Sequence, residues 1–151
     1  MEFLRWILFL PSAGAGGILG IFATILVLFF ISLANKFAGI QFNPDNPLGL
    51  IAMGYSFTYC WFATGMYVAP KKQDPKAVLF ALTTLLLFLT GVGWAPLFYR
   101  FNQTDFLSGK YIGFIWGLLG IIGTTAWIWF GNKPKKDLLA LHSGNWRKEK
   151  P

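Results

Sequence analysis

Side chains that could perform chemistry are few in this sequence, and no group of them has the spacing of a reactive site. There is one histidine, His142, and one cysteine, Cys60. A structural zinc site needs about four Cys, His or carboxylate ligands, and haem needs axial ligands such as His. Nucleophilic catalysis needs a base beside the nucleophile. We therefore predict a protein that is not an enzyme and has no cofactor or metal, with His142 on the surface of the tail.

The acidic and basic residues also avoid the apolar parts of the chain. They form five clusters separated by four long stretches without Lys, Arg, Asp, Glu or His. An ionisable residue inside a membrane helix is the usual marker of an ion path, a proton relay or a substrate site, and these stretches hold none. A nucleic-acid-binding protein would instead carry basic residues over one polar face. The net charge of +7 is therefore not interpreted as a nucleic-acid signal.

The four uncharged stretches predict membrane-spanning helices. The chain is 55% hydrophobic and only 13% charged, whereas a soluble domain carries about 25% charged residues. Each stretch is close to the ~20 residues that cross a hydrocarbon core. We predict an all-α, four-transmembrane-helix bundle in a single domain, residues 1–151. The spans lie at about residues 12–34, 50–69, 77–99 and 111–131, with residues 132–151 as a basic cytoplasmic tail.

The opening "MEFLRWILFLPSAGAGGILG" looks like a secretory signal with a cleavage site at Ala13-Gly14-Ala15. The apolar run continues to Ala34, however, so cleavage would remove half of one span, and we expect none. Pro11 offers a break in this run, because proline removes a donor and clashes with the preceding turn. One interpretation is a short interfacial segment, residues 2–10, followed by a span capped by Ser12; the alternative is one kinked helix.

The positive residues predict the orientation. With four spans both termini share a side, and ten of the thirteen Lys and Arg residues fall there: Arg5, Lys71, Lys72, Lys76, Lys133, Lys135, Lys136, Arg147, Lys148 and Lys150. Both termini should therefore face the cytoplasm, and the membrane is expected to be a plasma membrane such as the bacterial inner membrane. The tail is expected to lie on the anionic lipid surface through Lys133, Lys135, Lys136, Trp146, Arg147 and Lys148.

Small residues recur at four-residue spacing in three of the spans. In lipid, helices associate through close backbone approach, so small residues mark the faces that touch. The residues expected at such faces are Gly16 and Gly20 in the first span, Ser56 and Cys60 in the second, and Gly109, Gly113, Gly117 and Gly120 in the fourth. These faces pack either within the bundle or against a partner chain.

Two functions follow from this pattern. The first is a non-catalytic accessory or structural subunit that packs with other membrane chains or with itself. The second is a small channel or carrier for a neutral or lipidic solute. The second rests on Tyr55, Tyr59 and Tyr67, which either line a polar cavity beside Cys60 or serve as interfacial and packing residues.

Overall fold

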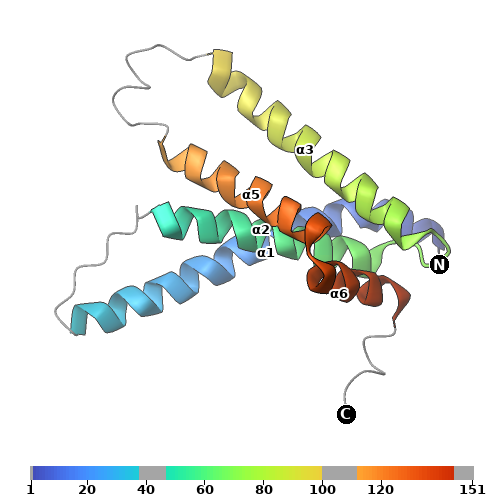
Figure 1. The fold of residues 1–151 in the computed structure, drawn as a ribbon, viewed down its shortest axis with the longest axis horizontal. Coiled ribbons are helices and arrows are strands. Elements are labelled where there is room, and N and C mark those ends of the chain that lie inside the picture. The colour runs from blue at the N-terminus through green and yellow to red at the C-terminus, as the bar shows by residue number, and fades with distance from the viewer. Residues whose placement is uncertain (1, 38–46, 100–111, 145–151) are drawn as a thin grey trace.

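The computed structural model describes residues 2–37, 47–99 and 112–144, and within these ranges the chain forms helices and no strand. This confirms the predicted all-α class. The helices are α1 (Glu2–Phe37), α2 (Pro47–Val68), α3 (Pro75–Tyr99), α5 (Ile112–Phe130) and α6 (Asn132–Ser143). Figure 1 shows their arrangement, in which α2 is central and α3 extends away from the others toward its carboxyl end.

Helix α2 packs against a different neighbour on each side. Helix α1 contacts one face, and α5 contacts another. Residues four apart share a face of a helix, so Ser56 and Cys60 lie on one side of α2, while Gly54 and Thr58 lie on the other. The small residues of α2 therefore serve two interfaces, and the helix is held between its neighbours.

The α1–α2 interface is closed by backbone contact. A Cβ atom added at Gly16 would lie 3.0 Å from the carbonyl oxygen of Cys60, and one added at Gly20 would lie 2.5 Å from that of Ser56. Thr24 Oγ1 donates a hydrogen bond to Ser56 Oγ at 2.6 Å in the next turn. The small residues expected at faces of the first two spans thus lie against one another, and no larger side chain fits between these backbones.

The α2–α5 interface is equally close but uses a glycine that the sequence did not single out. A Cβ atom added at Gly54 would contact the carbonyl oxygen of Gly117 and lie 3.1 Å from the Cα of Gly120. One added at Gly120 would lie 2.5 Å from the carbonyl oxygen of Ile51. The Cβ position of Gly117 itself has nothing within 4 Å. Gly113 lies in the first turn of α5, and Gly109 lies outside the described residues.

Helix α1 continues through Pro11, so the interpretation as two separate segments is wrong and the single-helix alternative is correct. Its first part runs at an angle to the rest (Figure 1), as expected where proline removes one backbone hydrogen bond. Ending the helix here would leave several backbone N–H and C=O groups without hydrogen-bond partners in apolar surroundings, whereas continuing it loses only one hydrogen bond. Ser12, expected to cap a new helix, instead donates its hydroxyl to the Phe9 carbonyl at 3.0 Å.

Helix α3 is attached mainly through its first half. Trp61 Nε1 donates to the Leu82 carbonyl at 3.4 Å, and Trp129 Nε1 donates to Thr83 Oγ1 at 2.9 Å. The buried core lies here: it includes Phe62 of α2 and Leu82 of α3, and residues of α1, α5 and α6 complete it. Two indole N–H groups from different helices thus fix the position of α3.

Two of the described helices are long and apolar enough to span a membrane. They are Phe3–Leu33 in α1 and Pro75–Val92 in α3; the apolar stretch Ile115–Phe130 in α5 is shorter. Only 17% of the most apolar window of α1, and 22% of that of α3, is buried within the chain. Helix α2, which lies between two neighbours, carries more Gly, Ser, Thr and Tyr because it faces protein on both sides.

Because Gly120 contacts backbone, Gly120→Leu should force α5 away from α2 and lower the free energy of unfolding in mild detergent by about 1–3 kcal/mol or more. Gly54→Leu should do the same from the other helix. Gly117→Leu is the matched control, since its side chain would enter open space. Thermal unfolding of the three variants measures the difference, and equal losses would contradict the contact described.

Candidate functional site

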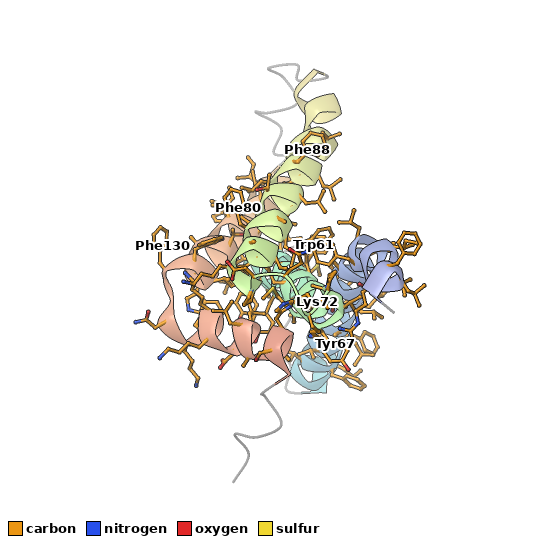
Figure 2. All side chains as sticks on the ribbon, turned by 90° about the vertical axis from the view of Figure 1, so that its right-hand side faces the viewer. Trp61, Tyr67, Lys72, Phe80, Phe88 and Phe130 are labelled. Carbon is orange, nitrogen blue, oxygen red and sulfur yellow. The ribbon has the colours of Figure 1, made fainter. Side chains whose placement is uncertain are left out.

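The site is built around the turn that joins α2 to α3, at the end of the molecule that faces the viewer in Figure 2. Asp74 begins α3: its Oδ1 accepts the Lys76 amide at 3.1 Å, and its carbonyl accepts the Val78 amide at 3.0 Å. This is an N-cap, and Pro75 occupies the first helical position, where no N–H is needed. The turn is therefore fixed by its own sequence.

His142 of α6 lies buried against this turn, with only 2% of its surface exposed. Its Nδ1 is 3.3 Å from the Met66 carbonyl oxygen, and its Nε2 is 3.1 Å from the Gln73 carbonyl oxygen. The expectation of a surface histidine is therefore wrong. The ring joins the end of α2, the turn and α6 in one contact.

The reason for this burial lies in Pro70. In a helix the Met66 carbonyl would accept the amide of residue 70, but proline has no N–H. A buried carbonyl without a donor is costly, and His142 supplies the N–H. Carbonyl oxygens only accept, so a neutral imidazole can satisfy one of the two carbonyls and an imidazolium can satisfy both. His142 is thus a structural link between segments more than 60 residues apart.

Helix α6 is amphipathic and docks by one face. Pro134, Leu138 and His142 are buried at four-residue spacing, as expected for a helix that packs along a single stripe. The helix ends at Gly144, whose φ of 75° is the left-handed conformation that glycine adopts most easily. Lys71 Nζ donates to the Leu141 carbonyl at 3.2 Å. Its positive charge is also stabilised there by the negative end of the α6 helix dipole.

Helix α6 packs on the chain itself through its apolar face, and the contact of the basic tail residues with lipid stays a prediction. Lys133 and Lys136 are exposed, and Lys135 Nζ lies 5.0 Å from the centroid of the Trp129 ring. The other tail residues expected at the lipid surface, Trp146, Arg147 and Lys148, lie outside the described residues.

Two cations from different segments lie near each other at this end. Burial lowers the pKa of Lys71, and the positive charge of Arg5 lowers it further. Lys71 also lies over the Tyr67 ring, 5.6 Å from its centroid, which is a cation–π contact. The ammonium group of Lys71 thus contacts the end of α6 and the Tyr67 ring of α2.

The tyrosines of α2 take part in ring packing. Tyr55 and Tyr59 are stacked with centroids 6.2 Å apart, and Trp127 of α5 lies 5.8 Å from Tyr55. Cys60 faces α1, with its Sγ 3.0 Å from a Cβ atom added at Gly20. Tyr55, Tyr59 and Cys60 are thus arranged as packing residues of two interfaces.

The remaining polar side chains of the described residues are mainly threonine hydroxyls and scattered titratable groups. Within them, no group of three or more His, Cys, Asp or Glu side chains could hold a metal ion. Thr58 Oγ1 is buried and has no hydrogen-bond partner, whereas Thr124 and Thr125 bond back to their own helix. Such back-bonding is the usual role of Thr in apolar helices.

Comparisons of this chain with protein-family models, with curated proteins and with solved structures found no match. The geometry of the chain itself is therefore the basis for interpreting its function.

His142→Ala should remove the ring that lies between the Met66 and Gln73 carbonyls, together with its N–H donor, and detach α6. Each unsatisfied buried carbonyl costs about 1–3 kcal/mol. We expect faster hydrogen exchange at the amides of residues 138–143, measured by mass spectrometry in detergent, with α1 and α2 unaffected. His142→Gln keeps side-chain N–H donors and should give a smaller effect, and unchanged exchange in His142→Ala would contradict the proposed link.

Proposed function

We propose that this chain is a non-catalytic, multi-pass membrane protein that crosses the bilayer four times and serves as an accessory or structural subunit of a membrane complex. The exposed surface of α1 supports membrane insertion. Large apolar side chains cover it over many turns: Ile18, Leu19, Phe22, Leu26, Phe29, Phe30 and Leu33. Soluble proteins rarely expose such a continuous apolar surface, and lipid or a neighbouring chain would cover it.

The placement of the basic residues supports a cytoplasmic location for both termini. The start of α1, the turn after α2 and helix α6 lie toward one end of the molecule (Figure 1). That end carries Arg5, Lys71, Lys72, Lys76, Lys133, Lys135 and Lys136. Segments rich in Lys and Arg stay on the cytoplasmic side of a plasma membrane.

Open glycines are the observation that carries the subunit proposal. Gly91 of α3 and Gly123 of α5 are exposed, and a Cβ atom at either position would meet nothing within 4 Å. Glycine in a helix interior costs about 1 kcal/mol relative to alanine, and among the described residues no contact at these two positions offsets that cost. In lipid, a small residue gains packing energy when another helix approaches it closely. A partner helix packed closely against each of these positions would account for the presence of glycine at both.

The orientation can be tested with reporter fusions. Fusions after Pro151 and within the segment around Asn102 should report opposite sides of the membrane, with the carboxyl terminus inside. A single cysteine introduced at either of these two sites, treated with one permeant and one impermeant label, provides an independent measurement. A carboxyl terminus outside the cell, or both sites on one side, would contradict four crossings.

The partner proposal can be tested by mild-detergent capture of the tagged full chain from native membranes, followed by mass spectrometry. Gly123→Leu and Gly91→Leu should lose the captured chain while keeping the unfolding temperature of the purified protein, because both side chains would enter space that is open in the isolated chain. Ala23→Leu, which also introduces a leucine at an exposed position of α1, is the control. Retention of the same partners by both glycine variants would contradict the proposal.

A further inference from the structure

A small cavity lies between the start of α1, the turn after α2 and the start of α3. Its volume is ≈ 110 Å³, and it is lined by Phe9, Pro70, Gln73, Ala77, Val78 and Ala81. Five of these six side chains are apolar, and they come from three separate segments. The residues that line it lie near the turn after α2, at the end of the molecule where Figure 2 labels Lys72 and Tyr67.

Two cations, Arg5 and Lys71, stand close in sequence to residues that line this cavity. Arg5 precedes Phe9 by four residues, so the two lie on one face of α1 with Arg5 a turn closer to the amino terminus. Lys71 follows Pro70 directly on the turn. Burial lowers the pKa of Lys71 and the positive charge of Arg5 contributes further, while the ammonium group itself contacts the Leu141 carbonyl and the Tyr67 ring. A group that lies near both would therefore be favoured if it were anionic.

The one carboxylate on this turn is already engaged. Asp74 Oδ1 accepts the Lys76 amide and caps α3, while Lys71, Lys72 and Lys76 surround it in sequence. Lys71 is also held by the Leu141 carbonyl and by the Tyr67 ring, so little side-chain freedom remains to be lost on binding. This end of the molecule thus presents preorganised positive charge beside an apolar cavity.

We propose that this cavity is a binding site for an anionic phospholipid. The phosphate lies between Arg5 and Lys71, and the end of one acyl chain or its first methylene groups enters the cavity between α1 and α3. A guanidinium group presents a planar fork that matches phosphate oxygens, and an ammonium group adds a point charge. Basic pockets between helices on the cytoplasmic side bind lipid headgroups by the same chemistry.

The shape of the site favours lipid over a partner helix. A helix is about 10 Å wide, whereas this cavity has a volume of only ≈ 110 Å³, and its lining includes the buried residues Pro70 and Val78. Ala77 and Ala81, one turn apart on α3, leave room for a flexible chain along that helix. The proposal rests on membrane insertion of the protein, which the reporter fusions test separately.

Native mass spectrometry of the full chain in detergent, titrated with dioleoyl phosphatidylglycerol or dioleoyl phosphatidylcholine, tests the site. We expect the anionic lipid to bind about tenfold more tightly, as for a charge-assisted contact. Arg5→Gln and Lys71→Gln should each remove most of that preference, and Lys71→Arg should keep it. Lys133→Gln, which removes an exposed charge on α6, is the control and should leave it unchanged.

Ala81→Leu tests the cavity separately from the charges. The larger side chain fills the cavity and should weaken the binding of both lipids about equally. Thermal unfolding of each variant confirms that it is folded. Equal binding of the two lipids by the unaltered protein, an equal loss in Lys133→Gln, or full binding in Ala81→Leu would each overturn the proposal. Competition by sn-glycerol 3-phosphate at the same concentration would also overturn it, because the site would then accept a free phosphate ester without acyl chains.

Discussion

Backbone contact on both sides of α2 is the constraint on which the arrangement of the other helices depends. On one side Gly16 and Gly20 bring α1 against the carbonyls of α2, and on the other Gly54 and Gly120 bring α2 and α5 together. Between apolar helices in an apolar solvent, burial provides little force, so many short van der Waals contacts must hold the helices. A glycine permits these contacts because its Cα can approach a neighbouring carbonyl directly. The surfaces of α1 and α5 opposite these contacts then face away from α2.

The second constraint is the pairing of backbone groups at the turn after α2. Pro70 ends the helix sharply but leaves the Met66 carbonyl without its usual donor. His142 supplies that donor from α6, and Lys71 of the same turn donates in return to the Leu141 carbonyl. The turn and α6 therefore complete each other. This exchange explains why a helix with a largely polar sequence is ordered against an apolar bundle.

These two constraints separate the surfaces of the molecule into two kinds. The long faces of α1 and α3 are apolar and mostly uncovered, while the end formed by the turn, α6 and the start of α1 is basic. A membrane protein needs this division, since the faces meet lipid or other helices and the end meets headgroups and water. The subunit and lipid proposals address these two surfaces separately, one through open glycines and the other through Arg5 and Lys71.

The sequence by itself determined the helical class, because long uncharged apolar runs bounded by proline and charge can satisfy their backbone groups only as helices in apolar surroundings. Its four-residue spacing also marked Gly16, Gly20, Ser56 and Cys60, which the structure brings together. Spacing did not distinguish Gly120 from Gly117, because both occur in the same glycine-rich run. Only the crossing with α2 decides at which of the two positions a side chain has no room. The burial of His142 was likewise decided by tertiary structure. The Met66 carbonyl beside its ring lies 76 residues away in the sequence, so the residues around His142 do not predict this contact.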